Sequence, residues 1–276
     1  MEPPVTKIQA SPRFGLEIKE IIAKHELLFY FMWRNFKIRY KQTVIGAGWA
    51  VFKPFILMVV FTLLFNKTIN VKTGAGNIPY PIFSYVGLLF WTYFSQTVVQ
   101  VGTSMVDNQS IFTKIYFPRL IIPLSTTLTG LIDFAAAALI YIVMMLHYGI
   151  YPTLSGSLLF IPMLLLSMIT VMGMGCYMAA LNVRYRDVSQ GLPFLIQVLL
   201  FLTPVIAAAS VVPGHWRWIL FLNPMAGVIE TMRASLLGTA TVDVGHLMIS
   251  VASALFMLIF GIRYFKHQEK IFADIV

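Results

Sequence analysis

Residues 27–54 read LLFYFMWRNFKIRYKQTVIGAGWAVFKP, a stretch in which a basic and aromatic segment runs directly into an apolar one. On a helical wheel Arg34, Lys37 and Lys41 share one stripe, because they are spaced i, i+3 and i+7. A neighbouring stripe holds four aromatic rings, Phe29, Trp33, Phe36 and Tyr40. This pattern is typical of a helix that lies in a membrane interface, with its rings among the headgroups and its cations beside lipid phosphate.

The composition indicates a polytopic membrane protein. The chain has 276 residues, of which 58% are hydrophobic and 11% charged, and its mean hydropathy is +0.80. These values lie far outside the range of soluble domains. The net charge of +9 does not indicate nucleic acid, because the cations cluster at the ends of apolar runs. They report membrane topology and contact with anionic lipid instead.

Six stretches reach the roughly 20 apolar residues that a membrane-spanning helix needs. They cover residues 44–65, 79–105, 120–148, 157–181, 192–212 and 244–264. Residues 212–243 are interrupted by Pro and Gly and carry charges, so we expect them not to span. The predicted fold is an all-α membrane protein with a flexible lead over 1–15, an interface helix over 16–43, a transmembrane domain over 44–265 and a tail over 266–276.

The distribution of Lys and Arg predicts the orientation of these spans. With the N-terminus inside, 16 of the 20 cations fall in internal segments and four in external ones. Cytoplasmic loops are enriched in Lys and Arg, so we expect both termini on the cytoplasmic side.

The sequence offers little for catalysis or metal binding. The five histidines are dispersed and the single cysteine, Cys176, lies in an apolar run, so no metal site is predicted. No GxxxxGK[ST] phosphate loop occurs, so work driven by ATP requires a partner that binds the nucleotide. We therefore expect neither an enzyme nor a cofactor in this chain.

Asp133 is the only acidic residue deep in a predicted span. A carboxylate inside the membrane is a candidate proton relay. The alternative is a structural carboxylate that is hydrogen-bonded to Thr126, to Thr129 or to another helix. Both interpretations are open from the sequence.

The loop at residues 107–118, DNQSIFTKIYFP, is a candidate docking element. Asn108 or Ser110 is suited to cap a short helix. Its apolar residues fall on one face and are Ile111, Phe112, Ile115 and Tyr116. Such a face on a loop meets either a protein partner or the membrane surface.

Residues 215–238 predict two short helices broken at Asn223 and Pro224, which either dip into the membrane as an outer lid or pack as an external cap. Aromatic stripes run along the first and fifth predicted spans. Their members are Trp49, Phe52 and Phe55, and Phe194 and Phe201. Such rings serve helix packing and lipid contact, or they stack on the faces of sugar rings in a channel.

Five segments together resemble one family. They are WRNFKIRYKQTVIGAGWAVFKP, FPRLIIPL, AALNVRYRDV, PFLIQVLLFLTPV and LNPMAGVIE, in order along the chain. The chain is similar to the membrane subunit of polysaccharide-exporting ABC transporters of the ABC-2 type, the O-antigen permeases of the Wzm type. Lys53 departs from the neutral Gln expected before the proline. A cation at that depth must snorkel, line water or contact an anionic substrate.

The resemblance implies a homodimer of six-helix protomers in the bacterial inner membrane, with a re-entrant helix pair between spans five and six. Two copies of a separate ATPase would bind ATP and Mg and drive a polyprenyl-pyrophosphate-linked polysaccharide to the periplasm. The basic residues Arg34, Lys37, Arg39 and Lys41 would face the pyrophosphate. The five aromatic residues of the two stripes would line the channel.

Two further segments receive roles from the resemblance. A coupling helix over 109–116 would seat on the ATPase through Ile111, Phe112, Lys114, Ile115 and Tyr116. A periplasmic gate over 215–237 would include Trp216, Trp218, Asn223, Pro224, Glu230 and Arg233.

Three alternatives remain from the sequence. The first is an ABC-2 permease for teichoic acid, capsular polysaccharide or another lipid-like substrate. The second is a membrane-embedded glycan transferase, which needs acidic metal ligands near a loop, where Asp107 and Asp187 stand isolated. The third is a proton-coupled transporter that depends on Asp133.

Overall fold

The computed structural model describes residues 14–41, 43, 45–46, 48–68, 78–112, 114, 117–152, 154–238 and 243–269, without the side chains of 14–18, 66–68, 112 and 154–155. Over these ranges the chain is helical and contains no strand. The helices are α1 Phe14–Ala23, α2 His25–Tyr40, α3 Gly48–Phe61, the π-helix η1 Thr62–Thr68, α4 Tyr80–Asp107, α5 Gln109–Phe112, α6 Ile121–Tyr148, α7 Leu154–Arg184, α8 Val188–Leu202, the 3-10 turn η2 Ala209–Val211, α9 Gly214–Leu220, α10 Pro224–Leu237 and α11 Val244–Glu269.

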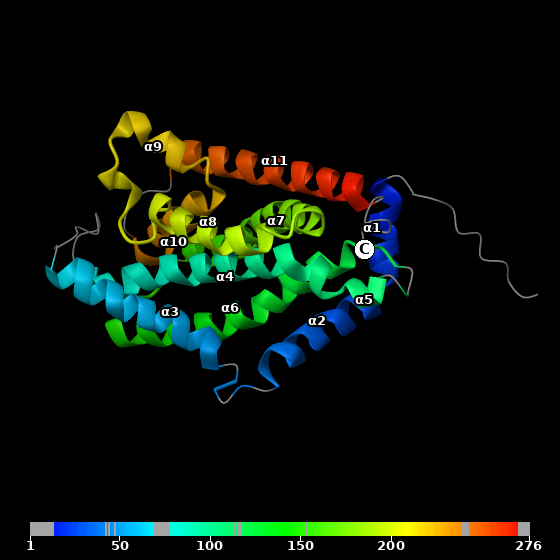
Figure 1. Ribbon diagram of the computed structural model, residues 1–276. Coiled ribbons are helices and arrows are strands. Elements are labelled where there is room, and N and C mark those ends of the chain that lie inside the picture. Colours follow the sequence, from blue (N-terminus) through cyan, green and yellow to red (C-terminus); the bar gives the residue numbers. More distant parts are fainter. Residues whose placement is uncertain are drawn as a thin grey trace, which may run out of the picture.

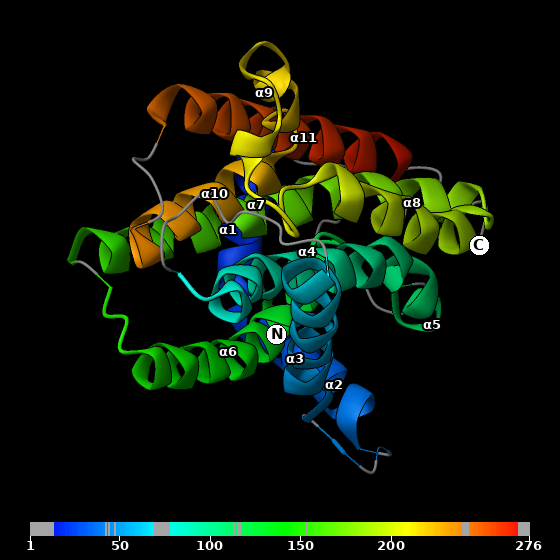
Figure 2. The ribbon, with the colours of Figure 1, turned by 90° about the vertical axis from the view of Figure 1, so that its left-hand side faces the viewer.

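Helix α4 lies at the centre of the bundle. It contacts α3 and α6 on one side and α7, α8 and α10 on the other (Figures 1 and 2). Helix α11 packs outside α7 and α10. One end of the bundle carries α1, α5 and the last turn of α11, and the other end carries α9 (Figure 1). We call these the α5 end and the α9 end.

Five described helices are long and apolar enough to cross a membrane: Gly48–Phe65, Tyr80–Ile111, Ile121–Tyr148, Gly156–Arg184 and Val244–Glu269. They coincide with five of the six predicted spans. The fifth predicted span, 192–212, corresponds to α8, which is apolar but has 15 residues. At 1.5 Å per residue α8 extends about 22 Å, short of the ~30 Å hydrocarbon layer. The helix ends because Pro204 forces the preceding Thr203 into an extended conformation.

The predicted interface helix is two helices in the structure. Helix α1 ends at Ala23, and the backbone of Lys24 leaves helical geometry (φ −101°, ψ 33°) before α2 begins at His25. The two helices diverge at this residue (Figure 1). Only α2 runs along the bundle, where it packs against α6.

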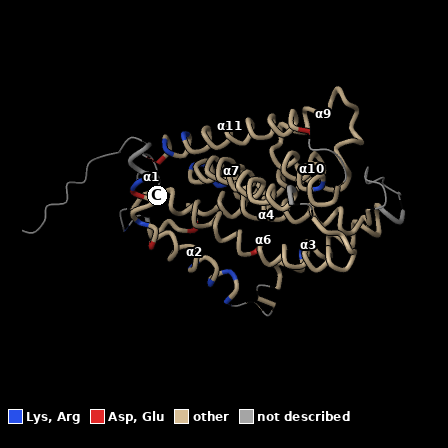
Figure 3. Tube along the Cα trace, turned by 180° about the vertical axis from the view of Figure 1, so that it is seen from behind, with Lys and Arg blue, Asp and Glu red and all other residues tan. Residues whose placement is uncertain are grey.

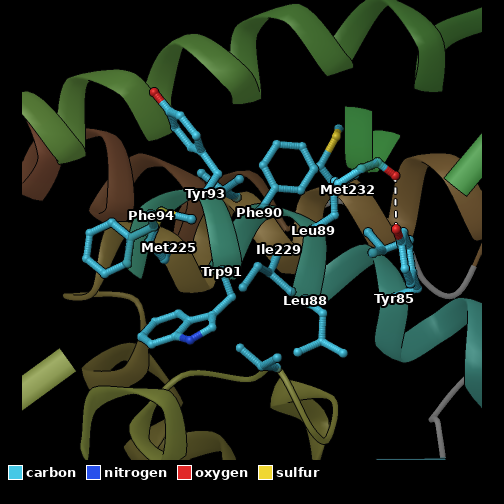
Figure 4. Close-up of a cluster of buried hydrophobic side chains, with 14 of the residues drawn as sticks. Tyr85, Leu88, Leu89, Phe90, Trp91, Tyr93, Phe94, Met225, Ile229 and Met232 are labelled. Carbon is cyan, nitrogen blue, oxygen red and sulfur yellow. Dashed lines mark hydrogen bonds between the residues drawn. The ribbon is translucent and has the colours of Figure 1, made fainter. Parts of the chain in front are cut away.

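The core between α4, α6, α7 and α10 is filled with large aromatic and aliphatic side chains. Phe90 contacts Phe134 of α6 and Phe160 of α7, with ring centroids 5.2 and 5.9 Å apart. Tyr85 lies in the same core, and its hydroxyl donates to the Ala137 carbonyl at 3.0 Å (Figure 4). Since this hydroxyl is satisfied, the ring stays buried at little polar cost.

Helices α7 and α11 approach each other through glycine. A methyl group added at Gly261 would overlap the carbonyl oxygen of Gly173. Small residues permit such backbone contact between apolar helices, where packing rather than the hydrophobic effect drives association. This contact holds α11 on the outside of the bundle.

We predict that Gly261→Ala lowers the stability of the bundle by about 1–3 kcal/mol, because the methyl group forces α7 and α11 apart. The midpoint of thermal unfolding in detergent measures the loss. The matched control is Gly191→Ala in α8, whose added methyl group meets nothing within 4 Å and should raise stability slightly. Equal midpoints for Gly261→Ala and the wild type would contradict the close contact.

Candidate functional site

Helix α2 is held to α6 by its middle turns. Phe31 is buried against Phe117, with ring centroids 5.4 Å apart. The Thr129 hydroxyl, whose proton goes mainly to the Ser125 carbonyl at 2.8 Å, lies 3.3 Å from the Met32 carbonyl, and the Asn35 amide donates to the Thr126 hydroxyl at 3.4 Å. This contact turns one side of α2 toward α4 and α6 and leaves the other side outside the bundle.

Arg34 lies on the inward side of α2. Its Nη2 donates to Asn108 at the end of α4 and to Asn35 at 3.3 Å, and the guanidinium lies 4.8 Å from the centre of the Phe31 ring. Burial lowers the pKa of Arg34 from its ordinary value, but an arginine stays protonated in proteins. The Arg34 Nε is buried and has no hydrogen-bond partner. A buried donor of this kind calls for an acceptor.

Arg39 also points inward and forms the central ion pair of the site. It pairs with Asp133 of α6 and donates to Gln100 of α4. The Tyr40 hydroxyl donates to the other Asp133 oxygen at 2.5 Å. Burial, followed by this hydrogen bond to Asp133, raises the pKa of Tyr40 to about 12, so the phenol keeps its proton.

Asp133 is therefore bonded to another helix. Of the partners considered from sequence, Thr126 and Thr129 are wrong, because their hydroxyls donate back to the carbonyls of Ile122 and Ser125 along α6. Such local bonds satisfy a helical threonine without a side-chain partner. The carboxylate turns instead to the cation of α2.

Two cavities meet at Arg39 and Gln100. The first has a volume of about 330 Å³ and lies between α2, α4 and α6, where Arg34, Thr103 and Asn108 line it. The second has about 390 Å³ and lies between the ends of α2 and α3 and the adjoining turns of α4 and α6. We call the pair the basic crevice. Its fixed guanidinium groups suit an anion with several oxygens.

The three residues predicted to share a stripe, Arg34, Lys37 and Lys41, do not share one environment in the structure. Lys37 and Lys41 are exposed on the outer side of α2, and the Lys37 ammonium lies 5.5 Å from the centre of the Trp33 ring. Arg34 and Arg39 line the crevice. The other wall of the basic crevice is formed by polar residues of α4, which were not predicted as site residues. Their spacing of i, i+4, i+7 and i+11 in the sequence could have identified them: Gln96, Gln100, Thr103 and Asp107.

The predicted channel aromatics are exposed in the single protomer. Trp49, Phe52 and Phe55 lie on α3, and Phe194 and Phe201 on α8. Helices α3 and α8 flank α4 on opposite sides (Figure 2). The two aromatic sets therefore lie on two helices that both contact α4.

The predicted coupling residues are described only in part. Helix α5 spans Gln109–Phe112. Ile111 packs on the cluster around Phe31, and Lys114 is exposed. The Phe112 side chain, Ile115 and Tyr116 lie outside the described residues. The Asn108 side chain does not cap α5. It accepts a hydrogen bond from Arg34 and donates one to the Ser104 carbonyl.

The predicted gate residues divide between surface and core. Trp216 and Trp218 of α9 are exposed. Asn223 caps α10, which begins at Pro224: its side chain accepts from the Met225 amide at 3.1 Å and donates to Thr203 at 2.7 Å.

Arg233 is 1% exposed and serves as a clamp inside the bundle. Its guanidinium donates to the carbonyls of Phe83, Pro204, Val205 and Ala207 and pairs with Glu230 at 3.0 Å. These contacts join α10 to α4 and to the turn after α8.

The ion pair between Arg39 and Asp133 generates a prediction about stability. Arg39→Gln and Asp133→Asn each leave a charge without its partner in a half-buried site, so each lowers the unfolding midpoint in detergent. The double variant should recover part of the loss, with an interaction energy of about 1–3 kcal/mol in a double-mutant cycle. Strict additivity would show that the pair contributes nothing. Arg263→Gln is the control, because Arg263 is exposed near the end of α11.

Comparisons with known proteins agree with the sequence resemblance. The O-antigen export system permease protein RfbA of Myxococcus xanthus is 28% identical over 260 residues, covering 93% of this chain and 98% of that protein. A permease of the same name from Klebsiella pneumoniae is 26% identical over 253 residues, covering 91% and 95%. The model of the ABC-2 type transporter family matches residues 26–237. This match includes the basic crevice and every predicted site residue. Because it covers most of the sequence, the chain belongs to the ABC-2 type transporter family.

Proposed function

We propose that the chain is the channel-forming membrane subunit of an ABC transporter that exports a polyprenyl-pyrophosphate-linked polysaccharide, an O-antigen, from the cytoplasm to the periplasm. ATP hydrolysis in a separate subunit drives the movement. Membership of the ABC-2 family and the names of its relatives support the class of transporter and cargo. The crevice supports the nature of the headgroup.

The observation that carries the proposal is the buried Arg34 Nε without a partner. Asn108 fixes the Arg34 guanidinium from one side, and a small rotation of the side chain would turn the unpaired Nε toward an incoming oxygen. Arg39 lies in the same cavity. Two fixed guanidinium groups match the paired phosphates of a pyrophosphate better than a mobile ammonium does. In this proposal Lys37 and Lys41 lie at anionic lipid instead.

The proposed orientation places the α5 end in the cytoplasm. Charged residues gather at this end and along α2, whereas the rest of the bundle is nearly free of them (Figure 3). The excess of Lys and Arg indicates the cytoplasmic side. The basic crevice then lies where a lipid-linked substrate made in the cytoplasm first meets the inner membrane.

The proposed assembly is a homodimer with two copies of the ATPase, which bind ATP and Mg. The polar residues of α4 and the exposed aromatic residues of α3 and α8 would face their copies across the two-fold axis. Residues 109–116 would seat on the ATPase. The carboxylate of Asp133 is held by Arg39 and Tyr40, so the proposal gives it a positioning role and no part in proton transport.

We predict that Arg34→Gln weakens binding of a polyprenyl diphosphate to the assembled transporter in lipid nanodiscs by about 10- to 100-fold. The loss of a charge-assisted hydrogen bond accounts for this range. Lys37→Gln, which removes the same charge from the outer side of α2, should change affinity less than threefold. If both variants lose the same affinity, the basic crevice contributes only a general electrostatic attraction and no specific contact. Each variant must also unfold at the midpoint of the wild type, so that the loss of affinity is not a loss of folding.

Docking of the ATPase yields a separate prediction. The combined change of Phe112→Asp and Ile115→Asp should abolish both ATPase co-purification and substrate-stimulated ATP hydrolysis, because carboxylates would enter an apolar contact. Tyr151→Asp is the control, since Tyr151 is an exposed aromatic residue at the α9 end. Co-purification of the doubly changed protein at the wild-type level would exclude residues 109–116 as the docking element.

A further inference from the structure

We infer that the second cavity of the basic crevice is a sugar subsite, which holds the glycan residue attached to the pyrophosphate. The inference rests on the proposed function and assigns a specificity role to Trp49, Lys53 and Gln96. The cavity has about 390 Å³, within the range of small-ligand pockets. It adjoins the Arg34 cavity through Arg39 and Gln100, so one ligand can occupy both.

The polar groups of this cavity fall into two sets. Asp133 and Arg39 satisfy each other, together with Tyr40 and Gln100. Gln96 and Lys53 line the same cavity, and their side chains make no hydrogen bond or ion pair within the described part of the chain.

Unpaired polar groups within apolar helices are costly, because the hydrocarbon layer provides no water to satisfy them. An amide and an ammonium left free around one cavity therefore indicate a hydrated or polar occupant. The amide of Gln96 offers both donors and an acceptor, and the Lys53 ammonium offers three donors. A ring of hydroxyl groups is such an occupant.

Trp49 completes the chemistry of a sugar site. It lines the cavity and remains 42% exposed, so a flat apolar ring face borders the free amide and ammonium. An aromatic face with an adjacent polar rim fits a pyranose, which has apolar C–H faces and polar edges. A second phosphate would use Lys53, Arg39 and the N–H donors of Gln96, but it would gain nothing from Trp49 or from the amide oxygen of Gln96.

The order of groups along the crevice follows the covalent order of the ligand. Arg34 and Arg39 lie in the first cavity, where the phosphates bind in the proposed function. Gln96 lies one helical turn along α4 from Gln100, about 5.4 Å toward the α9 end. This is about the separation of adjacent groups in a phosphate–sugar unit, so the residue joined to the pyrophosphate reaches Trp49 and Gln96.

The test uses the complete transporter with its ATPase in lipid nanodiscs and three probes. They are a polyprenyl monophosphate, the corresponding diphosphate, and the same diphosphate carrying one N-acetylhexosamine. We expect the wild type to bind the sugar-bearing diphosphate about tenfold more tightly than the bare diphosphate, as one or two added hydrogen bonds would give. Gln96→Leu and Trp49→Leu should each remove this preference and leave the affinity for the bare diphosphate unchanged.

Two controls separate recognition from folding. Gln190→Leu makes the same change on an exposed residue at the start of α8 and should keep the preference. Trp49→Phe retains an aromatic face and should restore most of what Trp49→Leu loses. If Trp49→Phe binds the sugar-bearing diphosphate no better than Trp49→Leu does, the ring of Trp49 does not stack on the sugar.

The outcomes distinguish this inference from the proposed function. If Arg34→Gln weakens both diphosphates but the wild type binds them alike, the sugar subsite is wrong and the headgroup site stands. If Lys53→Gln and Gln96→Leu instead remove a preference for diphosphate over monophosphate, the cavity holds the second phosphate. If Arg34→Gln weakens neither diphosphate, the proposed function itself fails.

Discussion

The ion pair between Arg39 and Asp133 is the constraint on which the arrangement of α2 depends. A carboxylate within an apolar helix is expensive unless a charge and hydrogen bonds compensate it. Arg39 and Tyr40 provide both, and Gln100 accepts a further hydrogen bond from the Arg39 guanidinium. Because α2 must deliver these groups to α6, its direction along the bundle is fixed. The same constraint presents Arg34 to Asn108 and places a polar bridge between the two cavities.

The opposite end of the bundle follows the same logic with a different solution. Arg233 is enclosed and satisfied by four backbone carbonyls and Glu230. Three of those carbonyls belong to the turn after α8, where Pro204 ends the helix and leaves acceptors without intrahelical donors. One buried cation therefore ties an unwound segment to α10 at the α9 end, and another ties α2 to the bundle near the α5 end. In the middle of the bundle, between these two cations, the helices are held mainly by apolar packing and by the glycine contact of α7 with α11.

The sequence was sufficient for the helices whose signal is local. Long apolar runs predict α3, α4, α6, α7 and α11, and Pro224 after Asn223 predicts the start of α10. The break between α1 and α2 at Lys24 could not be predicted in this way, because no Gly or Pro lies at that position. The sequence also did not predict that Arg34 lies inside the bundle and Lys37 outside it. A helical wheel groups the two residues, whereas the position of α6 decides which of them is buried. Asp133 was visible as an anomaly, but its partner lies 94 residues away, and spacing alone carries no information on such a contact.

A density map of the assembled transporter with a polyprenyl diphosphate bound tests the central claim most directly. The account predicts phosphate density within hydrogen-bond distance of Arg34 Nε, with Arg39 contacting the same headgroup and its pairing to Asp133 retained. Phosphate density on the outer side of α2, at Lys37 and Lys41, with Arg34 Nε still without a partner, would contradict it.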